Sequence, residues 1–413
     1  MMIYELKQMS LQTNILTLSL TLCVVALAAS SCGVVYDDYP TPDAPGDNNS
    51  SNTATEVKLS FRLAMNDKAA PPVLASRTDG SYENWGEGIS GEFPDWDPGD
   101  DYDNTIDPRS LRVTIVNNEG DLAATITSLI AIRDKDNKNN YTFEGTVTGK
   151  DVSLESGKQY KIVITANSPD VETPAAGFFN AAFDEWTYSW ANTEAGPAQT
   201  IPMYGLVTKT LDFTPGYRNE IGTIHLLRAA AKVDVALAAE SQALSEYEIV
   251  SVAIDRRNAG GFTVPGGVDL TTGATESISI DDSFREYTVA ATDGLDFYPV
   301  VENGTEKFRI YIPEWDNTTD PDTRATIAVT VRPRGEEDAE TTTFEGDRGI
   351  RFKKYTDDAY PADAPTGTFY NVIRNHYYKF DIQNIIITPE EDHLRFRVTI
   401  ADMEKGGDWT YEY

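Results

Sequence analysis

Cysteine and histidine are scarce in this chain: its 413 residues include two cysteines and three histidines. Cys23 lies within an N-terminal apolar run, and Cys32 follows that run after two serines. The rest of the chain has no thiol for a disulfide or a nucleophile, so it must be stabilised by burial of an apolar core. None of the three histidines has a metal-ligating residue two, three or four positions further along, which argues against the common zinc motifs: His225, His376 and His393.

Positive charge is also scarce. Lys and Arg number 34 against 66 Asp and Glu, which gives a net charge of −32. Binding to nucleic acid depends on clustered Lys and Arg, so this composition argues against a nucleic-acid partner. A strong net charge of one sign favours solubility and repulsion between copies, as expected of a protein exposed at a surface.

Motifs for catalysis are missing as well. The sequence contains no HExxH, no GxSxG and no P-loop. A GxGxxG match at 86–91 has no apolar strand before it and no helix pattern after it, so we attribute it to chance. A hydrolase would need two carboxylates that face each other in a cleft, and no pattern places such a pair. We therefore expect a protein that is not an enzyme and has no cofactor.

The N-terminus carries an export signal. An apolar run from Ile15 to Ala29 is too short for a comfortable membrane span, and small residues lead from it into Cys32. This layout predicts a lipoprotein signal peptide over residues 1–31 and acylation of Cys32. The alternative is an ordinary signal peptide with an incidental cysteine. No later apolar run approaches the length of a membrane span.

Two linkers flank one isolated strand near the start of the exported protein. Residues 32–55 are rich in Pro, Asp, Asn and Ser and cannot bury a core. The linker over 66–77 contains two adjacent prolines and Arg77, which predicts exposed chain open to proteases. Between the linkers, apolar and mainly polar residues alternate, which predicts a half-buried strand with one apolar face: Val57, Leu59, Phe61, Leu63 and Met65.

An acidic loop rich in Gly and Trp follows over 79–108. Its aspartates are a weak candidate for a Ca²⁺ site, although the Gly and the final Glu of an EF-hand loop are missing: Asp95, Asp97, Asp100, Asp101 and Asp103. A solvated acidic loop explains the same residues more simply. Trp85 and Trp96 are candidates for stacking on a sugar.

Most of the remaining chain consists of short alternating runs bounded by Gly, Asn, Asp or Pro. This pattern predicts an all-β, sandwich-like fold, with one short helix within 178–190. A break at Thr214–Asn219 divides it into domains over 56–218 and 219–413. The expected strands are 111–115, 141–147, 160–166, 201–206, 208–213, 221–237, 248–254, 286–290, 307–312, 326–331, 376–387, 394–400 and 409–413.

Segments spread along the chain resemble the fimbrillins, the major, FimA-type, fimbrial subunits of type V pili. The first is IPMYG at 201–205, followed by LLRAAAKVDV at 226–235. The others are IRNHYYKFDI at 373–382 and the tail HLRFRVTIAD at 393–402. The lipid cysteine, the linker, the alternating strand and an Arg in a small polar loop agree as well. The tail departs from the pattern because Asp402 and Met403 stand where fimbrillins often carry Trp.

The resemblance implies two tandem transthyretin-like β-sandwich domains and maturation by an Arg-specific protease that cuts the linker after the first strand. Arg77 is the best-placed site, because Arg62 lies inside the strand and Arg109 lies beyond the acidic loop. A cut after Arg77 would release residues 32–77 and leave a sandwich with an open groove and unpaired backbone groups.

The donor that the resemblance implies for this groove is the C-terminal segment of the next subunit, over 394–413. Its apolar residues alternate as those of the first strand do: Leu394, Phe396, Val398, Ile400, Trp409, Tyr411 and Tyr413. Because donor and acceptor are different surfaces, the contact is head-to-tail and builds a filament. The pattern alone favours the alternative that each strand pairs within its own domain, because alternation marks any half-buried strand.

The function expected from these observations is that of a fimbrial subunit at the outer membrane and cell surface, which supports adhesion. Its partners would be copies or paralogues of the subunit, the protease, host or bacterial surface ligands, and membrane lipid through Cys32. The shaft, tip and anchor positions in the fimbria stay open. The competing interpretation is an uncleaved surface lipoprotein that binds glycan or host protein.

Overall fold

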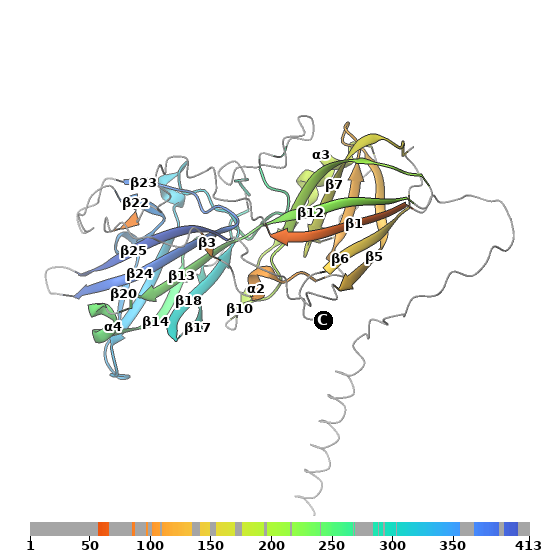
Figure 1. Cartoon of the computed structure of the whole chain (residues 1–413). Coiled ribbons are helices and arrows are strands. Elements are labelled where there is room, and N and C mark those ends of the chain that lie inside the picture. Colours follow the sequence, from red (N-terminus) through yellow and green to blue (C-terminus); the bar gives the residue numbers. More distant parts are fainter. Residues whose placement is uncertain are drawn as a thin grey trace, which may run out of the picture. The chain divides into compact units, whose positions relative to one another are not determined.

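A computed structural model of the chain describes residues 57–65, 85–86, 96–97, 101–107, 110–133, 141–148, 154–169, 176–193, 196–214, 217–239, 241–266, 268, 284–287, 289–291, 294–302, 304–355, 367–387 and 392–403. The described strands belong to one unit, Thr53–Tyr413. Strands dominate it and the helices are short (Figure 1), so the all-β prediction is confirmed. In the described part of the chain, no helix combines the length and the apolar composition needed to cross a membrane.

The strands of the first half close on themselves. They form a barrel in the order β1-β12-β11-β7-β4-β5-β6, in which each strand is hydrogen-bonded to its neighbours. Its strands are β1 (Val57–Met65), β4 (Arg112–Val116), β5 (Leu122–Arg133), β6 (Tyr141–Thr148), β7 (Lys158–Ala166), β11 (Met203–Leu211) and β12 (Arg218–Arg228).

The second half contains two larger sheets. The 7-stranded sheet has the order β17-β18-β13-β24-β25-β2, with β3 also paired to β25. Its strands are β2 (Trp85–Gly86), β3 (Trp96–Asp97), β13 (Ala231–Leu237), β17 (Tyr298–Glu302), β18 (Thr305–Ile312), β24 (His376–Ile387) and β25 (Asp392–Met403). The 5-stranded sheet consists of β14 (Tyr247–Ile254), β16 (Leu295–Asp296), β19 (Thr326–Pro333), β20 (Thr342–Phe344) and β21 (Ile350–Arg351).

Short elements connect the sheets. The two-stranded pairs are β8 (Thr187–Ser189) with β15 (Gly260–Phe262), β9 (Asn192–Thr193) with β10 (Gly196–Pro197), and β22 (Lys353–Tyr355) with β23 (Gly367–Phe369). The helices are α2 (Asp101–Asn104), α3 (Phe178–Glu185), α4 (Gln242–Glu246), and the 3-10 turns η5 (Pro321–Thr323) and η6 (Gly346–Arg348). Helix α3 falls inside the range where the sequence predicts one.

Each half has its own core because alternate residues of each strand point to one face of its sheet. In the barrel, β4, β7 and β12 contribute Val113, Ile162 and Ile224 to one buried cluster. In the second half, Val233 from the larger sheet and Val329 from the smaller one share a second cluster, as expected of a sandwich.

Several details differ from the sequence prediction. The expected strand 221–237 is divided into β12 and β13, and the expected strands 201–206 and 208–213 are one strand, β11. The first half is a closed barrel rather than two separate sheets, because β1 is hydrogen-bonded to β12 on one side and to β6 on the other. The division between the halves also lies later than residue 218. The turn residues at Thr214–Asn219 suggest a break, but Arg218–Arg228 forms the last barrel strand, and the second half begins with β13.

Candidate functional site

The candidate site is the slot between β12 and β6, which β1 occupies. β1 runs parallel to β12, from the Lys58–Arg218 pair to the Met65–Leu226 pair. It runs antiparallel to β6, from the Val57–Val147 pair to the Phe61–Phe143 pair. Figure 1 shows β1 (orange-red) alongside β12 and near β6 at the side of the barrel. The slot is therefore filled by a segment of the same chain.

Leu59 is the β1 residue whose side chain the structure describes. It is 0% exposed and belongs to the barrel core with Ile126 and Ile221. Complete burial of a leucine side chain stabilises a fold by roughly 1.5–3 kcal/mol. The alternation predicted from the sequence is thus supported at this position, and for Val57, Phe61, Leu63 and Met65 the structure describes the backbone pairing.

Two glycines shape the walls of the slot. Gly145 on β6 lies opposite Leu59, and a Cβ at Gly145 would come within 2.3 Å of the Ile126 side chain. Gly222 on β12 has φ +89°, a backbone conformation that other residues rarely adopt. It lies where β12 bulges, because Ser60 pairs with Glu220 and Phe61 pairs with Gly222. Both walls therefore have conformational and spatial requirements that a substitution would disturb.

The residues predicted for lipidation and for cleavage cannot be placed. Cys32 and Arg77 lie outside the described residues, as do the two linkers around β1. Their roles stay predictions from the sequence.

The predicted donor strand is paired within its own domain in this structure. Residues Asp392–Met403 form β25, which is antiparallel to β24 along its whole length, from Ile387–Asp392 to His376–Asp402. Leu394 is buried in the second core. The backbone of the other predicted donors up to Ile400 lies in the same strand: Phe396, Val398 and Ile400. The aromatic tail residues Trp409, Tyr411 and Tyr413 lie outside the described residues.

Parts of the acidic loop also pair with β25. Trp85 lies opposite Val398, and Trp96 lies beside Asp402. Of the candidate calcium ligands, Asp95 and Asp100 lie outside the described residues, and for Asp97 and Asp101 only the backbone is described. The side chain of Asp103 is described.

Asp103 contributes its carboxylate to an ion pair. Its Oδ2 lies 2.8 Å from Nζ of Lys232, and both side chains are almost completely buried. Burial alone would raise the pKa of Asp103, but the charges of Lys232 and Arg228 lower it below its ordinary value. The described residues contain no cluster of three or more His, Cys, Asp or Glu side chains that could hold a metal ion. Asp103 therefore acts as a structural counter-ion.

The segments that carry the resemblance lie side by side in the structure. β13, from the first segment, runs parallel to β24, from the second, between the Lys232–Tyr377 and Leu237–Ile382 pairs. Arg228 at the end of β12 donates to Asn375 Oδ1 at 3.0 Å and to the backbone oxygen of Asp103 at 2.7 Å. These segments thus form the junction where the barrel passes into the sandwich.

A buried ionic cluster lies on β13 and β18, and sequence analysis gave it no role. Asp234 is 0% exposed, and Arg309 donates to both of its carboxylate oxygens, at 2.7 and 2.8 Å. Lys307 Nζ lies 2.7 Å from the same carboxylate, and Tyr377 donates to it at 2.8 Å. A signal was present in the sequence, because Asp234 and Arg309 interrupt otherwise apolar runs at alternate positions.

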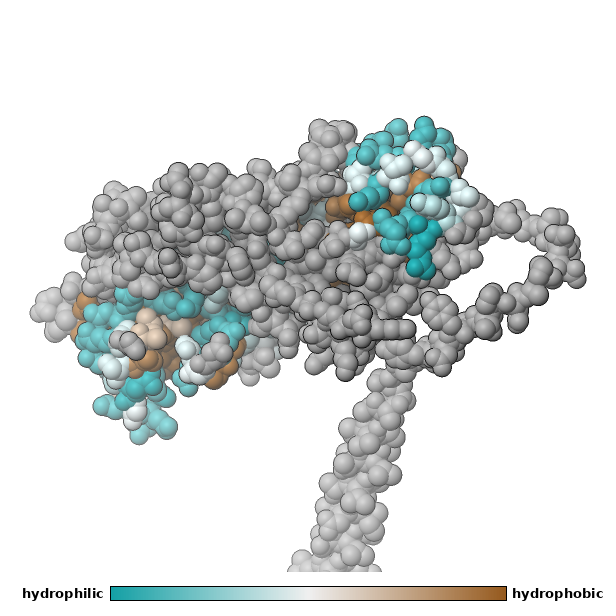
Figure 2. Space-filling model, viewed as in Figure 1, coloured by the Kyte–Doolittle hydropathy of each residue, from teal (hydrophilic) through white to brown (hydrophobic). Residues whose placement is uncertain are grey.

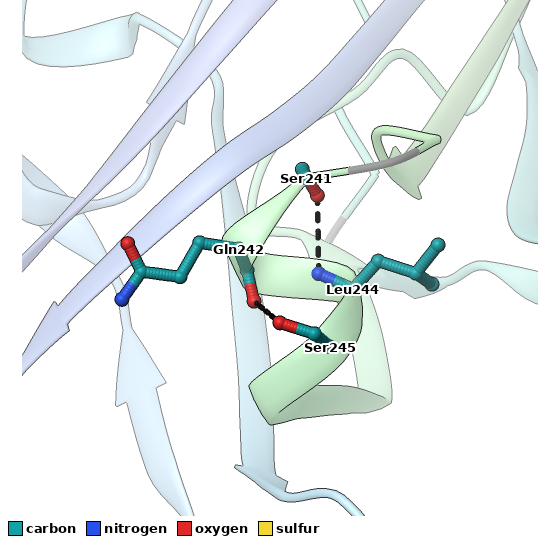
Figure 3. A pocket seen from close by; sticks show the side chains of 4 residues that line it. All are labelled: Ser241, Gln242, Leu244 and Ser245. Carbon is teal, nitrogen blue, oxygen red and sulfur yellow. Dashed lines mark hydrogen bonds between the residues drawn. The ribbon is translucent and has the colours of Figure 1, made fainter.

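A shallow surface hollow of about 430 Å³ lies beside helix α4 (Figure 3). Its lining consists of Ser241, Gln242, Leu244 and Ser245. The two serine hydroxyls are bound within the helix turn, to the Leu244 amide at 3.1 Å and to the Gln242 carbonyl at 2.8 Å. In the view of Figure 2, the coloured surface is mainly hydrophilic, with small hydrophobic patches (brown) between hydrophilic residues.

Comparisons with known proteins find similarity among solved structures. No family model and no curated protein matches the sequence. The tip fimbrial protein Mfa3 from Porphyromonas gingivalis, with C-terminal truncation, is 14% identical, with 84% of this chain and 99% of that chain covered at a TM-score of 0.39. A fimbrial assembly protein from Parabacteroides distasonis is 12% identical, with 83% and 98% covered at a TM-score of 0.36. Identities and TM-scores this low assign no function, so the proposal below rests on residues of this chain.

Proposed function

We propose that this protein is a structural subunit of a surface fimbria, exported as a lipoprotein, cleaved after Arg77 and joined head to tail by strand exchange. The observation that supports the proposal most is the place of β1. This strand completes the barrel, yet it is followed in the chain by the linker that contains Arg77. One cut would therefore separate β1 covalently from every other barrel strand.

Loss of β1 would leave the barrel open. The edges of β12 and β6 would each present unpaired backbone groups, and the core would lose Leu59. An exposed edge beside an apolar cavity favours binding of another extended strand, because main-chain hydrogen bonds and side-chain burial are restored together. The cleaved subunit thus becomes an acceptor.

The donor in this proposal is the C-terminal segment of a second copy or of a paralogous subunit. The apolar residues of 394–400 alternate as those of β1 do. In the free chain this stretch pairs with β24 on one side and with β2 on the other. Donation by it therefore requires β25 to leave both strands, whereas donation by residues 409–413 does not. Donor and acceptor lie in different parts of the chain, and the resulting contact extends into a filament.

The subunit would reach the cell surface as a membrane-bound precursor. Acylation of Cys32 would hold the precursor at the outer membrane, and an Arg-specific protease would release residues 78–413 for assembly at the cell surface. A single acyl chain binds a membrane only reversibly, whereas two or more hold a protein firmly. The fimbria would then support adhesion to host or bacterial surface ligands.

The experiment that tests the proposal is substitution of the cleavage site in expressing cells. Arg77→Ala should leave an acylated precursor that is folded and exported but forms no fibres. Arg109→Ala is the matched control, because it removes a neighbouring arginine without touching the proposed site, and its fibres should be as abundant as those of the wild type. Abundant fibres from Arg77→Ala would overturn the role of Arg77. A protein that remains monomeric at its full mature length in wild-type cells would favour a glycan-binding lipoprotein.

A further inference from the structure

The direction of β1 is unusual for its barrel. β1 is parallel to β12, whereas β4, β5, β6, β7 and β11 form antiparallel pairs with their barrel neighbours. Parallel pairing is slightly less stable per residue than antiparallel pairing. The contact between β1 and β12 is therefore the weaker kind of ladder.

The parallel ladder with β12 is also the longer of the two ladders that β1 makes. β1 has eight register pairs with β12, from Lys58 to Met65, and five with β6, from Val57 to Phe61. The facing edges of the slot run in opposite directions, since β1 is parallel to one and antiparallel to the other. A strand that entered in the reverse direction would be antiparallel to β12 along the longer edge and parallel only to β6.

The bulge in β12 independently supports a partner strand that runs antiparallel to β12. The register skips Ile221, and the next residue, Gly222, has φ +89°. Bulges of this kind are common in antiparallel pairs and rare in parallel ones. β12 pairs with β11 at its other end, through Arg228 and Leu227, so the bulge belongs to the edge that faces the slot. The edge thus carries, opposite the parallel β1, a bulge of a kind that is more often found opposite an antiparallel strand.

We propose that the slot accepts the C-terminal segment of a second copy in the direction opposite to β1, antiparallel to β12 and parallel to β6. This inference rests on the proposed function and adds the direction of the partner strand. β1 then fills the slot in the less stable of the two directions until the linker is cut. Exchange replaces a long parallel ladder with a long antiparallel one, which favours the joined state.

Cysteine cross-linking tests the direction, because residues 78–413 contain no cysteine. The acceptor positions are Glu220, which is exposed, and His225, both on β12. They are five residues apart, roughly 16 Å along a strand, whereas a disulfide needs Cα atoms within about 7 Å. Each acceptor variant, Glu220→Cys or His225→Cys, is combined with one donor variant. The donor variants are Arg395→Cys, Ala401→Cys, Lys405→Cys and Glu412→Cys. The fibres are then oxidised, and the intermolecular disulfide-linked products are identified by mass spectrometry.

The uncleaved precursor provides the matched control. In an Arg77→Ala background, Ser60→Cys should couple with Glu220→Cys, and Ala64→Cys with His225→Cys, because these residues are register partners of the parallel β1. This control shows that both acceptor positions react and that the variants fold.

The order of the donor residues decides the result. If the donor that couples with His225→Cys precedes in sequence the donor that couples with Glu220→Cys, the direction is antiparallel to β12, as proposed. The opposite order overturns the direction and leaves the fimbrial function intact. Fibres in which no donor couples with either acceptor overturn the occupancy of the slot by the tail. A wild-type protein that is cleaved but never forms fibres overturns the proposed function, and this inference with it.

Discussion

Asp234 shows how a single buried charge organises the second half of the protein. Its carboxylate accepts hydrogen bonds from Arg309 and Tyr377 and lies beside Lys307. Burial by itself would raise the pKa of this carboxyl, but the hydrogen bond from Arg309 and the charges of Arg309 and Lys307 lower it to about 2. Asp234 on β13 is therefore ionised in the folded state and forms ion pairs with Arg309 and Lys307 on β18.

Removal of the Asp234 charge should destabilise the protein strongly. Asp234→Asn removes the buried counter-ion of Arg309 and Lys307 and leaves them the partly exposed carboxylate of Glu302. We therefore expect the free energy of unfolding to fall by about 3 kcal/mol, the lower end of the range for breaking a buried ion pair. Asp381→Asn is the matched control, because Asp381 pairs with the partly exposed Lys379 at 2.9 Å. An exposed pair contributes at most about 1 kcal/mol. Urea unfolding of both variants measures the difference, and equal losses would contradict this account of the cluster.

The same carboxylate predicts a dependence of stability on acid. The pKa of Asp234 is lowered in the folded state from 3.8 to about 2, so the unfolded chain takes up a proton first as the pH falls. The stabilisation is complete above roughly pH 5 and is lost as the pH falls through 2, with a total of about 2 kcal/mol from this group. Urea unfolding at pH 5 and at pH 3 should show a shallower dependence in Asp234→Asn than in the wild type. The same pH dependence of the unfolding free energy in both proteins would contradict this role of Asp234.

At the scale of elements, β1 should matter to the precursor and be irrelevant to the fibre. Leu59→Ala removes a fully buried side chain from the barrel core, so the unfolding free energy of the precursor should fall by about 2–5 kcal/mol. Under the proposal, fibres assembled after cleavage contain no β1, so those grown from Leu59→Ala should dissociate at the same temperature as wild-type fibres. Lys58→Ala, at the neighbouring β1 position, is the control for the precursor. A Leu59→Ala fibre of lower stability would mean that β1 stays in the barrel.

A truncation of the C-terminal segment can show whether the donor is β25 or the aromatic tail that follows it. Truncation after Met403 removes the aromatic tail but keeps β25 and the buried Leu394, so the subunit should fold with nearly wild-type stability. If the tail is the donor, elongation stops, whereas unchanged fibre length assigns donation to β25. Thermal unfolding of the truncated monomer checks the first expectation, and a large loss of stability would show that residues 404–413 belong to the fold.

Much of the element order could be predicted from sequence, because alternation of apolar residues is a local signal. It indicated the strands at 57–65 and 376–387 and the short helix that follows residue 177. Closure of the barrel and the parallel contact of β1 with β12 could not be predicted. They pair residues about 80 to 160 positions apart, and a local pattern carries no information about partners at that separation. The alternation of 286–290 was also misleading, since in the described part of that range only Ala290 forms an isolated bridge.

Part of the candidate site could likewise be predicted from the sequence, and part could not. The alternation indicated Leu59 as an inward-facing residue, and its burial follows directly from that pattern. Asp103 was interpreted as a possible ligand in a solvated loop, whereas it is buried against Lys232 from a strand far along the chain. A charge deep in the fold is invisible to composition, because the partner that compensates it comes from tertiary structure.

At the scale of the whole molecule, the proposal joins three properties of the chain. The net charge of −32 keeps separate copies soluble through repulsion. The barrel is completed by a strand that a single cut would detach, and a paired C-terminal strand with the same alternation ends the described chain. In the proposal, such a subunit stays monomeric until it is cleaved and then binds the next copy.

The most direct test of this account is the N-terminal sequence and intact mass of the protein in fibres sheared from expressing cells. The proposal predicts a polypeptide that begins at Thr78 and lacks the lipid, in fibres that run as a ladder of multiples on a gel. A polypeptide that begins at an acylated Cys32 and still contains β1, found in the same fibres, would contradict it.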